Sequence, residues 1–372
     1  MKEVRLIIAA SERDADLYYA TRFLAPDPFP FFQIGTERVI MASDLELGRA
    51  RSQAAVQTIL PLQKYEDRAR ERVKQPTLVD AVGEALKERG IQQLVVPGNF
   101  PTEYADKLRS RGYELRVQEG IFFEERLVKS NAEIGWIGEA QHVAEEAMKI
   151  AIQAIREAEI RGNELYRAGE CLTSEGVRRL IQHALLDRDC FAEHTIVAGG
   201  EHGSDPHHEG TGPLPPHQPI VIDIFPRSGR TRYFADITRT VVRGRASSRV
   251  KQMYEAVLEA QAQALALIRH EADGAVIHQE VTAVFERRGF HTGEADGRMQ
   301  GFFHGTGHGL GLEIHEPPRI GKRGGVLRAG NVVTVEPGLY YPGEGGVRIE
   351  DVVVVTETGC RNLTRFQKLL EI

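Results

Sequence analysis

The alternation of apolar and polar positions predicts a small α/β domain at the start of the chain. Short apolar runs bounded by turn residues predict strands, and a later stretch has the apolar spacing of a helix. The predicted strands are residues 4–10, 31–34, 38–41 and 93–96, and the predicted helix is 78–89. Strands followed by a helix in this order favour a compact α/β unit over residues 1–128.

The pattern changes at Lys129. Ser130 and Glu133 have the spacing of a capping box, in which the serine accepts from a free helix amide and the glutamate reaches back. A long amphipathic stretch follows, with apolar residues on one stripe from 134 to 155. We therefore predict two domains, 1–128 and 129–372.

Helices and strands alternate in the second domain. Further helices are predicted after Thr173 and over 248–270 and 276–288. The predicted strands are 194–197, 219–225, 231–242, 331–336 and 347–356. Helix pairs that alternate with antiparallel strands predict an α+β arrangement, with the helices packed on one side of a curved sheet.

Composition and charge exclude several classes of protein. A formal net charge of −6, with basic residues scattered among acidic ones, gives no reason to expect nucleic acid as a partner. The three cysteines are far apart and lack a Cys-x-x-Cys spacing, so we interpret them as reduced core residues. The apolar run 6–10 is too short for a signal peptide or a membrane span. We therefore expect a cytoplasmic protein without membrane contact.

Two acids lie inside apolar strand segments. Asp223 follows Ile220-Val221-Ile222, and Asp236 follows Tyr233-Phe234-Ala235. A buried carboxylate is costly unless it is paired or bound to a metal. Residues 226–230 have turn chemistry, and the twelve residues between the acids are an even number, so we expect a hairpin in which Asp223 and Asp236 lie opposite each other. Two facing carboxylates repel each other and need a cation between them.

A second pair of acids repeats this arrangement. Glu336 ends the apolar segment 332–335, and Glu350 follows the glycine-rich turn 342–346, so we expect these two glutamates to face each other. The segment 304–316 adds histidines, and its glycines allow the backbone to approach a site closely. Its spacing fits neither a dinucleotide fingerprint nor the helical zinc motif. Four acids and one imidazole favour Mn²⁺, Co²⁺ or Zn²⁺.

These segments resemble the pita-bread metallopeptidases, in the branch that holds aminopeptidase P, prolidase and creatinase. The resemblance is close over residues 129–372, and the smaller N-terminal domain resembles the more variable domain of creatinase and prolidase. The five metal ligands of the family match Asp223, Asp236, His308, Glu336 and Glu350. Creatinase members lack the full ligand set, so the resemblance implies a metal-dependent enzyme. The spacing between the two aspartates is two residues longer than usual, which we expect to lengthen the hairpin tip without changing the face.

The resemblance also implies a role for each ligand. Asp223 would chelate one metal and His308 the other, with Asp236 and Glu350 bridging the two. Glu336 resembles the ligand that also takes a proton from the bridging water. Two divalent ions per chain are implied, with Mn²⁺ favoured over Co²⁺ or Zn²⁺.

Histidines and arginines outside the ligand set match substrate positions of the family. His207, His304 and His315 match histidines near the substrate, the last two beside the scissile carbonyl. Tyr340 and Arg348 match positions behind the ligands. The alternative is structural: satisfied histidines, and an arginine that pairs with Glu350 or Asp351.

The activity that the resemblance implies is hydrolysis of the Xaa-Pro bond through a metal-bridging hydroxide, by a homodimer. The substrate would be a dipeptide or the N-terminus of a longer peptide. Arg319 lies where some prolidases carry an arginine that suits a free carboxylate, which favours the dipeptide, although Arg319 pairing with a surface acid is the alternative. Two other functions stay open: a hydrolase or lyase of the same fold acting on a non-peptide small molecule, and a catalytically idle binding module.

Overall fold

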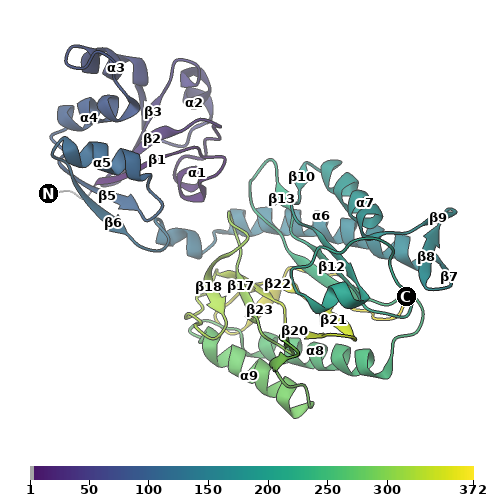
Figure 1. The fold of residues 1–372 in the computed structure, drawn as a ribbon. Helices are drawn as coiled ribbons and strands as arrows, with labels where there is room; N and C mark the ends of the chain where they lie inside the picture. Colours follow the sequence, from purple (N-terminus) through teal and green to yellow (C-terminus); the bar gives the residue numbers. More distant parts are fainter. Residues whose placement is uncertain (1–3) are drawn as a thin grey trace. The chain divides into compact units, whose positions relative to one another are not determined.

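The computed structural model describes residues 4–372, and the chain divides into two compact units (Figure 1). The first unit ends at Glu124, and the second comprises Glu125–Ile372. We keep 1–128 and 129–372 as the proposed domain limits, because the helix that the capping box begins starts at Asn131.

A six-stranded mixed sheet forms the first unit, in the order β4-β3-β2-β1-β5-β6. Its strands are β1 (Val4–Ala9), β2 (Phe29–Ile34), β3 (Glu37–Ala42), β4 (Thr58–Pro61), β5 (Gln93–Pro97) and β6 (Glu114–Gln118). Its helices are α1 (Ala15–Thr21), α2 (Leu47–Gln53), α3 (Leu62–Arg70), α4 (Leu78–Glu88) and α5 (Thr102–Ser110). Two apolar clusters, one with α1 and α2 and one with α3, α4 and α5, bury the two faces of the sheet. The predicted α/β character is confirmed.

Four helices shape the second unit: α6 (Asn131–Arg156), α7 (Ser174–Leu186), α8 (Ser248–Leu267) and α9 (Gly274–Arg287). The capping box is present, since Ser130 Oγ accepts from the Glu133 amide at 3.3 Å and Glu133 Oε2 accepts from the Ser130 amide at 2.8 Å. A side-chain oxygen of Thr173 likewise accepts at the start of α7. Among the described residues, no helix is both long enough and apolar enough to cross a lipid bilayer.

Antiparallel strands carry the site. One sheet has the order β11-β12-β14, with β11 (Ile196–Gly199), β12 (Ile220–Ile224) and β14 (Ile237–Val241). Another has the order β18-β17-β19-β22-β23, with β17 (Gly307–Gly309), β18 (Glu316–Ile320), β19 (Val332–Val335), β22 (Asp351–Val355) and β23 (Cys360–Asn362). β20 (Gly338–Tyr341) pairs with β21 (Gly345–Arg348). The short elements are β7 (Glu159–Arg161), β8 (Glu164–Arg167), β9 (Glu170–Cys171), β10 (Cys190–Phe191), β13 (Arg227–Ser228), β15 (Gly293–Ala295), β16 (Arg298–Gln300), η1 (Glu124–Leu127) and η2 (Gly200–Ser204).

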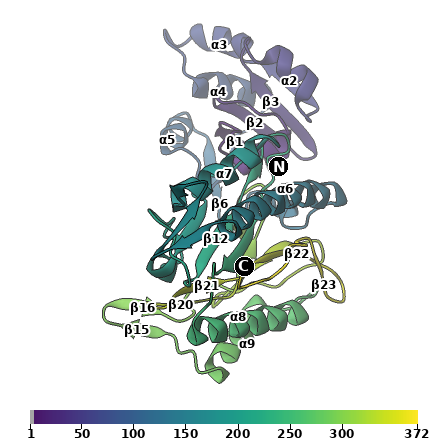
Figure 2. The same ribbon diagram turned by 90° about the vertical axis from the view of Figure 1, so that its right-hand side faces the viewer.

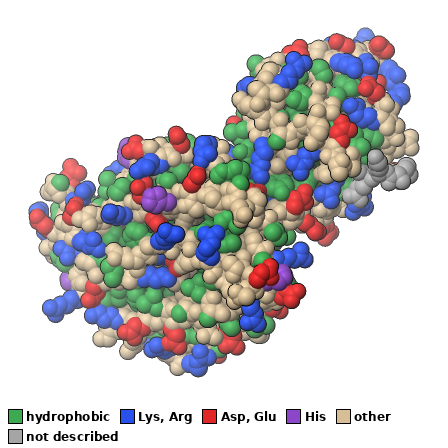
Figure 3. All heavy atoms as spheres, turned by 180° about the vertical axis from the view of Figure 1, so that it is seen from behind, with side chains coloured by type: hydrophobic (Ala, Val, Ile, Leu, Met, Phe, Trp, Pro, Cys, Tyr) green, Lys and Arg blue, Asp and Glu red, His purple; other side chains and the backbone are tan. Residues whose placement is uncertain are grey.

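Each helix pair packs on one group of strands. Residues of α6 and α7 share an apolar cluster with β12 and β14, and residues of α8 and α9 share another with β19, β21 and β22. Figure 2 shows α8 and α9 along one side of β20 to β22. The predicted arrangement of helices against one side of a curved antiparallel sheet is confirmed. Figure 3 shows acidic and basic side chains interspersed over the face that it draws.

Two predicted strands are shorter than the apolar pattern indicated. β14 begins only at Ile237, not at residue 231, and the predicted strand 347–356 is broken between Arg348 and Asp351. At the break the Glu350 amide donates to the Thr238 carbonyl at 3.0 Å. The backbone therefore leaves its ladder to bond a neighbouring strand at the residue that carries an acid.

Candidate metal centre

The first two acids share a face of the β12–β14 hairpin without lying opposite each other. The ladder pairs Asp223 with Thr238, and the same register extends to the bridge between Arg227 and Phe234. The expectation that Asp223 faces Asp236 directly is therefore wrong by two residues. Because side chains alternate along a strand, a shift of two keeps Asp236 on the same face, diagonal to Asp223.

A glutamine from α6 holds the backbone of Asp236 in place. Gln141 Nε2 donates to the Asp236 carbonyl at 2.8 Å, and Gln141 Oε1 accepts from the Asp236 amide at 3.1 Å. Both backbone groups of Asp236 are thus satisfied by one buried side chain rather than by a neighbouring strand. Sequence reasoning missed Gln141, which looks like one more polar residue of an amphipathic helix.

The second pair of acids lies in a gap between two ladders. Val335 pairs with Asp351 on one side, and Gly338 pairs with Arg348 on the other, with the same register. Glu336 and Glu350 therefore face each other, as the sequence indicated. Thr238 Oγ1 donates to Glu350 Oε2 at 2.8 Å, which ties this pair to the hairpin of the first pair.

His308 brings the imidazole to these acids from β17. Its Nε2 lies 3.7 Å from Asp236 Oδ2 and 3.5 Å from Glu336 Oε1. Its Nδ1 lies 3.1 Å from the Gly309 carbonyl oxygen, so Nδ1–H donates there and the Nε2 lone pair faces the carboxylates. One oxygen of Asp236, one of Glu350 and a ring nitrogen of His308 lie within 4.8 Å of one another.

The glycines around His308 serve strand packing rather than approach to the site. A Cβ atom on Gly307 would lie 1.9 Å from the Thr334 carbonyl oxygen of β19. A Cβ atom on Gly309 would lie 2.4 Å from the Pro317 carbonyl oxygen. Only glycine therefore lets β17 lie between β18 and β19 while it presents His308.

Burial and mutual repulsion disfavour charge on the acids. Burial, followed by the neighbouring carboxylate of Glu350, raises the pKa of Asp236 well above its usual range. Burial also raises the pKa of Glu350, and it raises the pKa of Glu336 to about 7. Burial lowers the pKa of His308 to about 3, so its imidazole is neutral and free to bind a metal.

Three of the acids each present an oxygen that has no partner. Oδ1 of Asp223, Oδ1 of Asp236 and Oε1 of Glu350 are buried and accept no hydrogen bond from the described residues. Buried polar atoms are nearly always satisfied, so such atoms call for a bound ion or water. Oxygen donors with one imidazole suit a divalent cation, and the residues therefore fit a metal site.

Arg348 balances part of this negative charge. Its Nη2 donates to Asp223 Oδ2 at 2.7 Å, and its Nη1 donates to the Tyr340 hydroxyl at 2.8 Å. The alternative that Arg348 pairs with Glu350 or Asp351 is wrong, because Asp351 pairs with Arg239 and Lys368. Arg348 therefore connects the first acid to the pocket above it.

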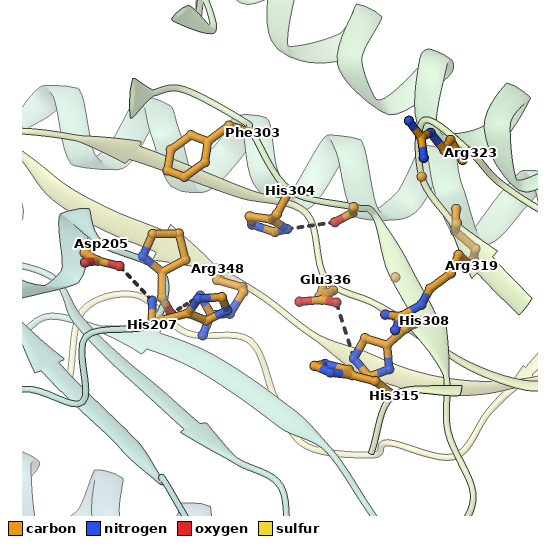
Figure 4. Close-up of a pocket in the computed structure, with 15 residues that line it drawn as sticks. Asp205, His207, Phe303, His304, His308, His315, Arg319, Arg323, Glu336 and Arg348 are labelled. Carbon is orange, nitrogen blue, oxygen red and sulfur yellow. Dashed lines mark hydrogen bonds and ion pairs between the residues drawn. The ribbon is translucent and has the colours of Figure 1, made fainter. Parts of the chain in front are cut away.

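A cavity of about 560 Å³ opens over Glu336 and His308 (Figure 4). Arg319 and Arg348 line it. So do the three histidines that the sequence analysis assigned to the substrate, His207, His304 and His315. Figure 4 shows His304 and His315 on opposite sides of Glu336. Phe303 and Arg323 also line the cavity. The sequence analysis missed them, because a single aromatic residue and a single arginine carry no functional signal of their own.

A second cavity of about 310 Å³ is lined by all four acids and His308. Its lining also includes the apolar side chains of Ile196, Phe225 and Ile314 and the exposed pair of Glu209 and His194. The two cavities share Glu336, His207, His308 and His315, so the acids and the candidate substrate histidines line connected parts of one site.

The chain matches the known family of metallopeptidases M24 over residues 135–357. It belongs to metallopeptidase family M24. It is 31% identical to the Xaa-Pro dipeptidase of Pyrococcus furiosus over 340 residues, which cover 90% of this chain and 87% of that protein. It is 30% identical to the Xaa-Pro dipeptidase of Pyrococcus horikoshii over 285 residues, or 76% of this chain and 75% of that one.

Solved structures of M24 type share the fold over the whole chain. The Xaa-Pro dipeptidase from Bacillus anthracis has a TM-score of 0.82 and 25% identity, covering 99% of this chain and 95% of its own. The X-Pro aminopeptidase from Thermotoga maritima has a TM-score of 0.82 and 24% identity, and the match covers 100% of this chain and 98% of that one. The pita-bread fold and the branch that the sequence resembled are confirmed. The M24 family implies a dinuclear site for divalent metal ions, which the acid and histidine cluster fits.

Proposed function

We propose that the chain is a metal-dependent exopeptidase that hydrolyses the bond between an N-terminal residue and a following proline. The observation that carries the proposal is the set of buried, unpartnered carboxylate oxygens of Asp223, Asp236 and Glu350, which line the smaller cavity together with His308 and His315. Two relatives that the chain matches over three quarters or more of their length are both named as Xaa-Pro dipeptidases, which supports proline after the scissile bond.

Five residues would hold two divalent ions: Asp223, Asp236, His308, Glu336 and Glu350. When bound, the ions would supply an acidified water at neutral pH and polarise the scissile carbonyl. Mn²⁺ is the ion that we propose, with Co²⁺ or Zn²⁺ as alternatives, because the donors are mainly oxygen atoms. Elemental analysis after growth with each metal, set against turnover, tests the choice.

Glu336 is the acid suited to proton transfer. Its side chain is 19% exposed, whereas the side chains of Asp236 and Asp223 are 6% and 12% exposed, and it lines the larger cavity. We propose that Glu336 accepts a proton from the attacking water and returns it to the leaving amine.

His315, rather than His304, would donate to the developing oxyanion. His304 Nδ1 lies 2.7 Å from the Gly305 carbonyl oxygen and must carry the proton there. Burial lowers the pKa of His304 to about 3, so its Nε2 is bare, and it accepts from the Tyr340 hydroxyl at 2.9 Å. Both ring nitrogens are thus engaged. His315 makes no hydrogen bond with the described residues, so an N–H of its ring is available.

We propose a dipeptide as the preferred substrate. Arg319 and Arg323 line the larger cavity, and neither forms an ion pair with an acid among the described residues. This supports substrate binding by Arg319 over the alternative that it pairs with a surface acid. Guanidinium groups suit a free carboxylate, which a dipeptide places directly beyond proline. The smaller cavity would then receive the first residue.

A substrate-length series tests the proposal. Turnover of Ala-Pro, Ala-Pro-amide, Ala-Pro-Ala and longer peptides is measured with added Mn²⁺. We expect Ala-Pro to have the highest kcat/KM. Faster cleavage of tripeptides and longer substrates would replace the dipeptidase with an aminopeptidase. Two bound ions without turnover of any Xaa-Pro substrate would favour a non-peptide substrate, and a metal-free chain without turnover would favour a binding module.

The proposal extends to a homodimer, which the family resemblance implies, and to a location in the cytoplasm, which the short apolar run 6–10 favours. Sedimentation equilibrium of the metal-loaded protein and fractionation of cells test the two statements. A fully active monomer would contradict the proposed homodimer.

A further inference from the structure

A buried group of charged side chains lies beside His315 and outside the metal centre. The side chain of Glu316 is 1% exposed, that of Lys129 2% and that of Arg126 3%. Lys129 Nζ donates to Glu316 Oε1, and Arg126 Nη2 donates to Glu316 Oε2 at 3.1 Å. We call these three residues the Glu316 cluster.

The Glu316 cluster is not explained by stability alone. Removing charges from water is costly, and a buried ion pair often stabilises no more than apolar residues of the same volume. Such pairs are best understood as devices that fix one arrangement of the chain. The structural element that this one fixes is the loop 310–316, which connects β17 with β18.

The loop is folded closely over the Glu316 carboxylate. A Cβ atom on Gly311 would lie 2.6 Å from Glu316 Oε1. Arg126 Nη2 also donates to Glu313 Oε2 at 2.9 Å, so the loop is held at two of its acids. The Gly311 carbonyl accepts from the Phe234 amide at 2.8 Å, two residues before Asp236. The Glu316 cluster therefore holds a loop that is bonded to the strand segment of a metal ligand.

His315 depends on this loop for its position. Its side chain is exposed and makes no hydrogen bond or ion pair with the described residues. Its ring packs edge-on against the ring of His308, with centroids 4.4 Å apart and planes at 84°. Its aim into the cavity is thus set by the backbone, and the next residue along that backbone is the anchored Glu316.

We propose that Lys129 and Arg126 are positioning residues for His315, which act by anchoring the carboxylate of Glu316. The inference rests on the proposed function for the role of His315, and it adds two residues far earlier in the sequence to that role. Neither Lys129 nor Arg126 is among the residues that line the two cavities.

The test compares the effect of one substitution in the wild type with its effect in a variant that lacks His315. Lys129→Met keeps the length of the side chain and removes its charge, and it is made in the wild type and in His315→Ala. In the wild type we expect kcat to fall about tenfold, because a small displacement of a reacting group costs up to a hundredfold. KM for Ala-Pro and the metal content are expected to stay unchanged. In the His315→Ala background we expect a further change of less than about twofold, since the residue that Lys129 positions is already gone.

Control variants separate position from folding. Lys129→Arg keeps the charge and is expected to retain activity, and Lys149→Met removes an exposed lysine of α6 and is expected to have no effect. If Lys129→Met does not fold, Glu316→Asp replaces it, since the shorter side chain pulls the loop without removing the charge. An equal loss of kcat in both backgrounds, a loss of metal or an unchanged kcat would each overturn the proposal.

A spectroscopic measurement keeps this inference separate from the proposed function. With ¹⁵N-labelled histidine, the His315 signals are those that disappear in His315→Ala. We expect them to shift or broaden in Lys129→Met and to stay in place in Lys149→Met, whatever substrate the enzyme cleaves. Unchanged His315 signals would refute the positioning role, whereas absent Xaa-Pro turnover with shifted signals would refute only the proposed function.

Discussion

The metal-free protein is predicted to lose stability as the pH rises from about 7 to about 8.5. Burial and repulsion between carboxylates raise the pKa of Asp236 and of Glu350 well above the usual range, and that of Glu336 to about 7. Unfolded carboxyl groups ionise near pH 4. In this window the folded chain therefore binds protons that the unfolded chain has lost, so the free energy of unfolding falls as the pH rises.

Histidines set the lower limit of this window. Burial lowers the pKa of His304 and of His308 to about 3, whereas an unfolded imidazole titrates near 6.5. Below that pH the unfolded chain binds the extra protons, and stability increases with pH, against the effect of the acids. Above pH 7 these imidazoles are neutral in both states. Each proton that the folded acids retain then lowers stability by about 1.4 kcal/mol per pH unit.

The assay is thermal unfolding of chelator-treated protein across this window, with and without saturating Mn²⁺. One retained proton lowers stability by about 2 kcal/mol between pH 7 and 8.5, or roughly 4–8 °C in Tm for a unit of this size. Mn²⁺ should cancel the slope, because it binds the ionised acids and releases protons. Glu336→Gln should reduce the slope near pH 7, and the exposed control Glu294→Gln should leave it unchanged. A flat Tm without metal, or less than about one proton released per chain on metal binding, would refute the reasoning.

Three further predictions concern single side chains. Asp236→Ala or Glu350→Ala is expected to abolish turnover together with metal binding, and elemental analysis that finds metal-free protein with undiminished turnover would contradict it. His315→Ala is expected to lower kcat by on the order of 10²–10³ with the metal retained, as for the loss of one oxyanion donor; a loss of metal or an unchanged kcat in steady-state assays would be the contrary result. Arg319→Ala is expected to raise KM for Xaa-Pro and to leave Xaa-Pro-amide hydrolysis nearly unchanged, so an equal effect on both substrates would exclude carboxylate binding.

The sequence was sufficient to find the acids and most of the fold. An acid within an apolar run is rare enough to mark Asp223, Asp236 and Glu350 one by one, and the capping box at Ser130 marked the long helix. Short strands such as β17 and β20 were missed, because β17 has glycine at two of its three positions and β20 has only four residues without apolar–polar alternation. Their pairing depends on close backbone approach, which a pattern of side chains does not express.

The register of the first acid pair is where pattern and structure differ. Counting residues gave the parity of the two acids but not the place of the hairpin turn, and the ladder pairs Asp223 with Thr238 and Arg227 with Phe234. Gln141, which bonds both backbone groups of Asp236, is 95 positions away on a helix, and no local period predicts that contact. The even number of residues between the two aspartates still placed Asp236 on the correct face of the hairpin. It did not predict which residue lies opposite Asp223.

The same physical principle links the metal centre with the Glu316 cluster. In both, a functional side chain lies where the backbone leaves a regular ladder, and polar groups from distant elements hold that stretch of the chain. Gln141 does so for Asp236, and Thr238 does so for Glu350 through its carbonyl and its hydroxyl. Lys129 does so for the loop of His315, through Glu316. An isolated buried polar or charged group is costly, and a group that keeps its hydrogen-bond partner has few allowed positions. Each of these contacts therefore restricts the site to one geometry. The residues that act on the substrate are thus visible in local patterns, whereas the residues that aim them are visible only in the folded chain.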